Sequence, residues 1–244
     1  MELSEHTVLV TGGTSGIGLS LAERFLRAGS DVVVCGRRTD KLDEVKAKHP
    51  KIHARACDVA VAAERLSLAD WVVGEFPQLD VLVNNAGIQR RIDLATNEPW
   101  ETTHNEIAIN FEAHVHLCGL LLPHLREQEG PAIINVTSGL AFVPLTAAPI
   151  YSATKAAFHS FTLSLREQLK KTPIEVVEII PPAVNTDLGG PGLHAFGTPL
   201  EEFIDAVVAQ LQQGRSEITY GFSAQATQAS PTQRDEMFAR MNSG

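Results

Sequence analysis

The sequence has few cysteines, more acidic than basic residues and no long apolar run. Its 244 residues contain three cysteines, Cys35, Cys57 and Cys118, without a C-x-x-C pair or a metal-ligand spacing. This pattern predicts reduced, buried thiols and no metal site. The formal net charge of -9 argues against nucleic-acid binding, because clustered lysine and arginine hold a phosphate backbone. No run approaches the ~18 apolar residues of a membrane span, so no membrane association is expected.

No leader is expected, and the sequence shows no internal repeat and no low-complexity linker. Residues 1–5 are acidic and run directly into the first apolar stretch, without the basic and apolar regions of a signal peptide, which predicts a cytoplasmic protein. At 44% hydrophobic residues, the chain can bury one sizeable core. We expect a single domain over residues 1–221. We expect a polar C-terminal tail over residues 222–244 that is helical, partly disordered or laid over a neighbouring subunit.

Short apolar runs alternate with helix and turn signals along most of the chain. Residues 8–10, 31–35, 79–83 and 132–136 are such runs. The alternation is typical of βαβ units around a parallel sheet, and it predicts an α/β, Rossmann-like doubly wound fold. In such folds, ligands bind at the carboxyl ends of the strands.

The first of these units, Thr7–Gly18, reads T-V-L-V-T-G-G-T-S-G-I-G. A buried strand runs into a glycine turn and then into a helix, whose first N–H groups and positive dipole end can hold a pyrophosphate. Three residues separate Gly12 from Gly16, so the run departs from the G-x-G-x-x-G fingerprint. The alternative is a tight corner that binds nothing.

The end of the second expected strand is where the adenosine ribose of a dinucleotide would lie. NAD-binding proteins place an acidic residue there, about 20 residues past the glycines, to hold the 2′-hydroxyl. This chain instead has Gly36, Arg37 and Arg38. The carboxylate that would repel a 2′-phosphate is therefore missing, and two guanidiniums that can bind one are present. The alternative is a solvated helix start, although arginine there works against the helix dipole.

Two later strand ends carry polar residues. The run Asn84–Gly87, N-N-A-G, lets backbone approach a flat ligand closely, or else it is an ordinary turn. The run at 132–136 delivers Thr137 and Ser138 to the ligand side of the sheet. Phe142 follows, and it either walls a substrate pocket or packs within its own loop.

Tyr151 and Lys155 lie four residues apart at the head of a helical segment and so share a face. A lysine ammonium beside a phenol lowers its pKa from about 10, which lets the tyrosine protonate a carbonyl oxygen as hydride reaches the carbon. Ser138 could hydrogen-bond the same oxygen. Lys155 could also reach the nicotinamide ribose. Considered alone, the pair could equally be a surface i, i+4 contact.

Taken together, these motifs resemble the short-chain dehydrogenase/reductase family in order and approximate spacing over residues 6–221. The resemblance implies a seven-stranded parallel sheet in the order 3-2-1-4-5-6-7. It implies Tyr151 as general acid/base, Ser138 as the residue that positions the carbonyl, and Lys155 as activator of the tyrosine and anchor of the ribose. Asn110 would hold a water in the proton relay.

The resemblance also implies a site for NADP(H). The residues that match its cofactor contacts, or belong to the motifs above, are Gly12, Ser15, Gly16, Ile17, Gly18, Arg37, Arg38, Asp58, Val59, Asn84, Ala86, Gly87, Tyr151, Lys155, Pro181, Val184 and Thr186. Members that prefer NADPH have arginine at the Arg37 position. Pro182 stands where the family usually has glycine, and this form resembles a bacterial subgroup associated with the lipoteichoic acid D-alanylation operon.

Other polar residues are open to two interpretations. A long helix is expected over about 102–129 with a break at Pro123, and its four histidines, His104, His114, His116 and His124, are expected to be exposed or at an interface rather than metal ligands. Asn110, a poor helix former, either has a special role or faces solvent. Arg90 and Arg91 either bind an anionic substrate or lie in a solvated loop. His194 and Phe196 are further candidate substrate contacts.

We therefore predict an oxidoreductase that transfers hydride between NADP(H), in preference to NAD(H), and a small or medium aldehyde, ketone or secondary alcohol. Ser138, Phe142 and Tyr151 are the expected substrate contacts. The resemblance implies a homodimer or homotetramer. Two alternatives remain, a non-catalytic NADP(H)-binding sensor or scaffold and an NAD-linked dehydrogenase. The sequence identifies neither the substrate and its stereochemistry nor the direction of the reaction.

Overall fold

Seven short strands, most of them apolar and rich in β-branched residues, form one parallel sheet. In the computed structural model, which describes residues 1–96 and 99–243, the strands are β1 Thr7–Thr11, β2 Asp31–Gly36, β3 His53–Ala56, β4 Val81–Asn84, β5 Ala132–Val136, β6 Glu175–Ile180 and β7 Glu217–Thr219. Their order is β3-β2-β1-β4-β5-β6-β7, with every neighbouring pair parallel, which confirms the predicted topology. The order in which successive strands are added to the sheet reverses between β1 and β4, which is where doubly wound folds bind ligands.

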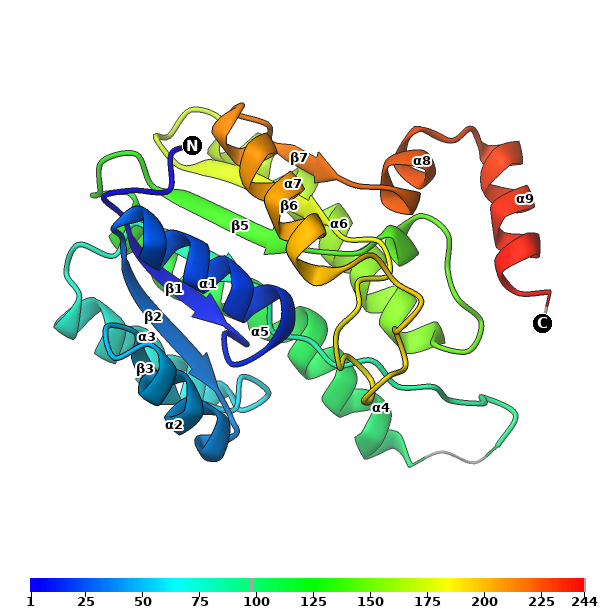
Figure 1. The fold of residues 1–244 in the computed structure, drawn as a ribbon, viewed down its shortest axis with the longest axis horizontal. Helices are drawn as coiled ribbons and strands as arrows, with labels where there is room; N and C mark the ends of the chain where they lie inside the picture. Colours follow the sequence, from blue (N-terminus) through cyan, green and yellow to red (C-terminus); the bar gives the residue numbers. More distant parts are fainter. Residues whose placement is uncertain (97–98, 244) are drawn as a thin grey trace.

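Helices cover both faces of this sheet (Figure 1). One face carries α1 Gly16–Ala28, α2 Thr39–Lys48 and α7 Leu200–Gln212, and the other carries α3 Ala62–Glu75, α5 Ala113–Leu125 and α6 Pro149–Leu169. Each set buries its apolar side chains in a separate cluster against the strands. A further helix, α4 Trp100–Ile107, packs against α6.

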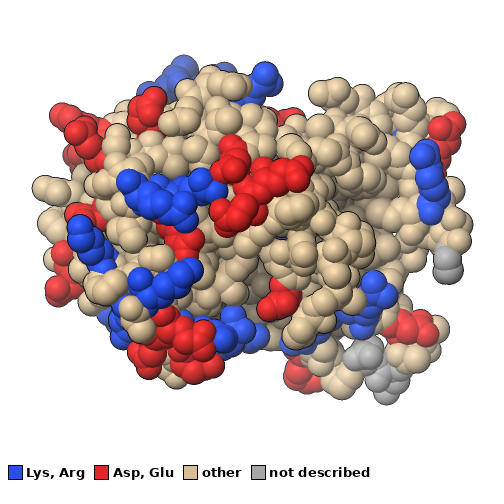
Figure 2. Space-filling model, in the orientation of Figure 1, with Lys and Arg blue, Asp and Glu red and all other residues tan. Residues whose placement is uncertain are grey.

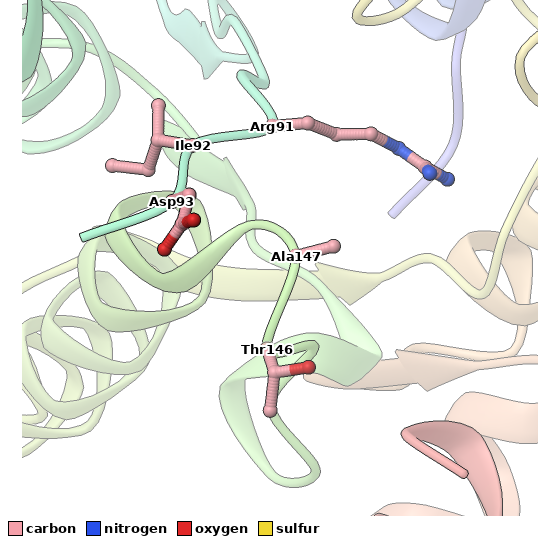
Figure 3. Close-up of a pocket in the computed structure, with 5 residues that line it drawn as sticks. All are labelled: Arg91, Ile92, Asp93, Thr146 and Ala147. Atoms are coloured by element: carbon pink, nitrogen blue, oxygen red, sulfur yellow. The ribbon is translucent and has the colours of Figure 1, made fainter. Parts of the chain in front are cut away.

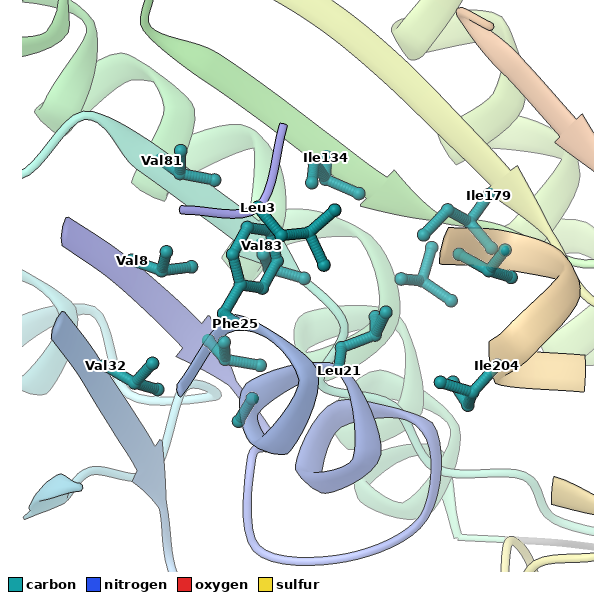
Figure 4. Close-up of a cluster of buried hydrophobic side chains, with 14 of the residues drawn as sticks. Leu3, Val8, Leu21, Phe25, Val32, Val81, Val83, Ile134, Ile179 and Ile204 are labelled. Atoms are coloured by element: carbon teal, nitrogen blue, oxygen red, sulfur yellow. The ribbon is translucent and has the colours of Figure 1, made fainter. Parts of the chain in front are cut away.

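The cluster under α1 and α7 fixes the helix that follows the glycine turn. Figure 4 shows Leu21 and Phe25 of α1 and Ile204 of α7 directed at strand residues that include Val8 and Val81. All five side chains are completely buried. Removing a buried phenylalanine ring typically costs about 3–5 kcal/mol, so this packing holds the first turn of α1 firmly at the end of β1.

The long helix expected over about 102–129 forms, but its interruption lies elsewhere. Helices α4 and α5 are joined by η1, a π-helical turn at Ala108–Glu112, while Pro123 lies inside α5. The predicted break at Pro123 is wrong because proline in the last turn of a helix removes only one backbone hydrogen bond there. Single π-turns within helices are frequent at functional sites, and this one contains Asn110.

Two helices, α8 Phe222–Gln228 and α9 Pro231–Met241, form the C-terminal tail. Ser230 begins α9 with a capping box that it shares with Gln233. Beyond the helix, the Asn242 amide accepts a hydrogen bond from the Thr146 N–H at 2.7 Å and donates one to the Pro144 carbonyl at 3.1 Å. These contacts lay α9 beside the loop that precedes α6 (Figure 1).

Acidic and basic side chains lie next to one another over the face of the molecule shown in Figure 2. Several are paired, such as Arg24 of α1 with Glu201 and Asp205 of α7. Within residues 1–96 and 99–243, no helix is both long and apolar enough to cross a membrane.

Candidate functional site

A cleft of about 1410 Å³ runs along the carboxyl ends of β1 to β6. Its lining includes most of the residues that the sequence singled out for cofactor, catalysis or substrate: Gly12, Ser15, Gly16, Ile17, Arg37, Arg38, Asp58, Val59, Ala86, Gly87, Arg90, Arg91, Ser138, Tyr151, Lys155, Pro181, Val184, Thr186, His194 and Phe196. Four other candidates, Gly18, Asn84, Asn110 and Phe142, are not among its lining residues. Residues far apart in the sequence therefore meet in one site, because all six strand ends point the same way.

The glycine turn is fastened to the Asn84–Gly87 loop. The Thr11 hydroxyl accepts hydrogen bonds from the N–H groups of Asn85 and Ala86 at 3.0 and 3.1 Å, and the Asn85 amide donates to the Thr11 carbonyl at 2.9 Å. Gly12 has φ +65°, and a Cβ there would come within 2.9 Å of the Ala86 Cα. Only glycine therefore allows this approach. A Cβ on Gly18 would likewise meet the Asn85 amide at 2.3 Å, so Gly18 packs beneath the turn.

The first turn of α1 opens into the cleft without a competing acid. Ser15 is the N-cap residue, its side chain makes no capping hydrogen bond, and the first turn of the helix contains no carboxylate. Unpaired N–H groups and the positive end of the helix dipole therefore face the cleft, as an anion site requires.

Basic side chains gather at the β2 end of the cleft. Arg37, Arg38 and Lys41 line it, and an Nη of Arg38 donates to the Ser15 hydroxyl at 3.2 Å. Lys41 is paired with Glu44, whereas among the described residues Arg37 has no ion pair. The arginines thus lie beside the glycine turn, where they can hold an anion together with it.

Ser138, Tyr151 and Lys155 converge at the other end of the cleft. Burial raises the pKa of Tyr151 to about 12, with the Ser138 hydroxyl acting in the opposite direction and the Glu106 charge adding to the rise. Lys155 donates from Nζ to the Val136 carbonyl at 2.8 Å, and Nζ lies 5.7 Å from the centroid of the tyrosine ring. Burial lowers the pKa of Lys155 to about 8.

The expected lowering of the Tyr151 pKa by Lys155 is therefore wrong for this arrangement. The ammonium is directed at a backbone carbonyl, and the phenol is withdrawn from water, which disfavours the phenolate. The phenol is consequently protonated at neutral pH, ready to donate.

Asn110 is completely buried, so the alternative of a solvent-facing side chain is wrong. Its Oδ1 accepts from the Ile88 N–H and its Nδ2 donates to the Ile88 carbonyl, both at 2.9 Å. The π-turn aims this residue inward, because the extra residue per turn rotates it off the outer face. Asn110 thereby fixes the loop that follows Gly87.

Among the helix histidines, His114 departs from expectation. It is completely buried, stacks on Phe158, and donates from Nε2 to the Ala86 carbonyl at 2.8 Å. Burial lowers its pKa to about 3, and the charges of Lys155 and Arg65 add to this effect, while the hydrogen bond to Ala86 opposes it. The expectation of an exposed or interface residue is wrong here, because a bonded neutral imidazole packs well against an aromatic ring.

The depressed pKa of His114 predicts a specific acid sensitivity. A folded chain that keeps this histidine neutral binds one proton fewer than the unfolded chain below pH 6.5, so the stabilisation is complete above pH 6.5 and is lost as pH falls toward about 3. His114→Gln keeps an amide donor but does not titrate. Urea unfolding between pH 7 and 5 should show a pH dependence for His114→Gln that is weaker than in the wild type, by up to about 1.4 kcal/mol per pH unit. His104→Gln, at an exposed position on α4, should match the wild type. Parallel curves for all three proteins would contradict the assignment.

Two buried acids, Glu178 and Glu106, and one buried amide, Gln89, were not anticipated from the sequence. They are 0%, 1% and 6% exposed, respectively. Glu178 had a recognisable signal, since it is a charged residue inside the otherwise apolar run Val176–Ile180. Glu106 had no such signal, because polar residues occur on every side of its helix, α4.

Arg90 and Arg91 follow the Asn84–Gly87 loop and both line the cleft. Arg90 donates to the Thr102 carbonyl at 2.7 Å, which ties it to α4. Arg91 also borders a smaller cavity of about 430 Å³, where its side chain extends from the loop opposite Thr146 and Ala147 (Figure 3).

His194 and Leu188 lie in the cleft near Arg91, and Phe196 is 79% exposed at its rim. The ring of Phe142 packs against the ring of His159, with 4.6 Å between the ring centroids, and the guanidinium of Arg234 lies over the Phe142 ring.

No group of three or more histidine, cysteine or acidic side chains suited to a metal ion occurs in the described part of the chain. The three cysteines are free and buried.

Comparison with known proteins places this chain among a large set of similar sequences and folds. The model for short chain dehydrogenases matches residues 6–193. The protein called uncharacterized oxidoreductase DltE, from Bacillus subtilis, is 45% identical over 248 residues, which is 99% of this chain and 98% of that relative. A crystal structure of a short chain dehydrogenase from Burkholderia cenocepacia in complex with NADP has a TM-score of 0.83 at 25% identity and covers 99% of both chains. A short-chain dehydrogenase from Sphingobium yanoikuyae in complex with NADPH has a TM-score of 0.81 at 26% identity, over 96% of this chain and 95% of that one.

Proposed function

Because the chain belongs to the short-chain dehydrogenase/reductase family of oxidoreductases, we propose that it is an NADP(H)-dependent carbonyl reductase or alcohol dehydrogenase. The observation that carries the proposal is a single cleft with Arg37 and Arg38 at one end and Ser138, Tyr151 and Lys155 at the other. Similar folds bind NADP and NADPH, which supports the same cofactor here.

The residues that line the cleft fit NADP(H) bound in an extended conformation. Gly12 lies so close to Ala86 that a side chain would close the approach to the turn. The open first turn of α1 would hold the pyrophosphate, and Arg37 and Arg38 would hold the 2′-phosphate. Asp58 and Val59 would border the adenine, while Pro181, Val184 and Thr186 would border the nicotinamide. When bound, NADP(H) supplies or accepts the hydride at nicotinamide C4.

The chain's own groups then handle the carbonyl oxygen. Tyr151, whose phenol is protonated at neutral pH, donates its proton to that oxygen during reduction and is left as the phenolate, and the phenolate form accepts the alcohol proton during oxidation. Ser138 donates a hydrogen bond to the same oxygen and shares its developing charge. The Lys155 ammonium, 5.7 Å from the centroid of the Tyr151 ring, would contact the ribose. Asn110 holds the loop after Gly87 in place and, by family resemblance, a water of the proton relay.

The substrate proposed is a small or medium aldehyde, ketone or secondary alcohol. Ser138 and Tyr151 would contact its oxygen, with apolar residues near Phe142 forming the wall. Leu140, Leu145, Phe222 and Met241 line this part of the cleft and give it an apolar surface. We also propose a cytoplasmic homodimer or homotetramer in which residues 1–221 form the catalytic domain and 222–244 an appended tail.

The experiment is to measure NADPH consumption by the purified protein over a panel of aldehydes and ketones, with NADH in parallel. Turnover with NADPH and little with NADH supports the proposal. Equal turnover with NADH would favour the NAD-linked alternative. Tight NADPH binding without turnover in either direction would favour a sensor or scaffold.

A further inference from the structure

A buried carboxylate lies behind the catalytic end of the cleft. Glu178, on β6, is completely buried, and its Oε1 accepts a hydrogen bond from the Thr137 hydroxyl at 2.7 Å. His159 donates from Nδ1 to the same carboxylate, at 2.9 Å from Oε1 and 3.0 Å from Oε2. A carboxylate is retained in such a site only if it is well bonded, and these contacts meet that need.

Thr137, Glu178 and His159 link the end of β5, which presents Ser138, to helix α6, which carries Tyr151 and Lys155. Thr137 directly precedes Ser138 at the end of β5. His159 lies one helical turn after Lys155 on α6, so the two side chains share a face of that helix. His159 also packs against Phe142 at 4.6 Å. The Glu178 carboxylate therefore ties the serine-bearing strand end to the lysine-bearing helix.

Glu178 also acts on Lys155 through its charge. Lys155 is buried and has a carbonyl, not a carboxylate, as its hydrogen-bond acceptor. The negative charge of Glu178 raises the pKa of Lys155 and so opposes the effect of burial. The other titratable groups facing this region are His114 of α5, Tyr151 of α6 and, through its effect on Tyr151, Glu106 of α4. Of these, His114 is neutral and Tyr151 is protonated at neutral pH.

We propose that Glu178, held by Thr137 and His159, is a positioning residue that keeps Lys155 charged and braces the strand end that presents Ser138. This role rests on the proposed function, because it concerns the same lysine and serine. The proposal gives a role to Glu178 and His159, which do not line the cleft.

The test is Glu178→Gln, which removes the charge but little else. The glutamine amide can still accept from Thr137, and His159 can change tautomer to accept from the amide. Lys155 is charged below its pKa of about 8, so a property that needs the ammonium is lost as pH rises through that value. Without the Glu178 charge, this loss should occur at a pH lower by about one unit.

Two measurements distinguish a failure of the role proposed for Glu178 from a failure of the proposed reductase activity. The first is the alkaline limb of kcat/KM for NADPH-dependent reduction. The second is the lysine titration itself, followed by magnetic resonance of protein with isotope-labelled lysine, with the Lys155 signal assigned by Lys155→Met. The second needs neither cofactor nor turnover. An acid shift of the Lys155 titration in Glu178→Gln supports the proposal even if no carbonyl substrate is found.

Variants at His159 distinguish bracing from general loss of structure. His159→Asn keeps an N–H donor near Nδ1 and should retain most of the activity, whereas His159→Leu should reduce it by about tenfold, as expected for a lost hydrogen bond to a buried charge. His49→Leu is the matched control, because His49 bonds Glu23 at 2.8 Å and is as exposed as His159, but does not line the cleft. An unshifted lysine titration in Glu178→Gln, or equal losses in His159→Asn and His159→Leu, would overturn the proposal.

Discussion

Tyr151→Phe is expected to lower turnover by between about 100-fold and 10,000-fold, the range over which a positioned general acid contributes. Tyr151 is 6% exposed and the pKa of its phenol is raised by burial, so the phenol acts as a proton donor held in place by packing. Phenylalanine fills the same volume and removes only the hydroxyl. Steady-state kinetics with the best carbonyl of the panel, beside an NADPH fluorescence titration, measures both consequences.

NADPH affinity should be largely unchanged in that variant, because most of the cofactor contacts lie elsewhere in the cleft. The matched control is Tyr220→Phe, whose hydroxyl bonds Glu202 outside the cleft. It should turn over at the wild-type rate. Undiminished turnover in Tyr151→Phe would remove this residue from the mechanism.

Arg37→Asp is expected to weaken NADPH binding by about 10-fold to 100-fold, as for the loss of a charge-assisted phosphate contact. Arg37 lines the cleft and has no ion pair among the described residues, while Arg38 beside it bonds Ser15. An aspartate would also accept from a ribose 2′-hydroxyl, so NADH affinity should hold or rise. Fluorescence titrations with both cofactors give the ratio directly.

The control for Arg37→Asp is Lys46→Asp, the same change of charge on the exposed side of α2. Lys46 pairs with Asp43 and does not line the cleft. It should affect both cofactors slightly and equally. If Arg37→Asp left the NADPH to NADH ratio unaltered, Arg37 would be a solvated helix-start residue after all.

The fold was predictable because its signals are local and repeated. The alternation of apolar runs with turn signals predicted a doubly wound α/β fold, and the family resemblance implied the seven parallel strands in the order found. The family resemblance was also correct, and the similarity to DltE confirms the resemblance to its subgroup. Strand ends carrying Gly12, Ser138 and Pro181 meet in one cleft because parallel strands share an edge.

Other features depend on packing that periodicity does not encode. The π-turn at 108–112 decides that Asn110 points inward, and nothing in the run A-I-N-F-E marks it. The burial of His114 follows from its stacking on Phe158, forty-four residues away in the chain. The raised pKa of Tyr151 follows from the burial of its phenol, which spacing alone leaves open. Tertiary contacts settled each of these.

The most direct test of the account is to follow the hydride itself. The purified protein would be given NADPH deuterated at nicotinamide C4 and a ketone that it consumes, and the alcohol product would be analysed by mass spectrometry. The account predicts one deuterium on the carbinol carbon, from one of the two C4 faces only, and almost no product with Tyr151→Phe. A product that forms without deuterium from either face would contradict it.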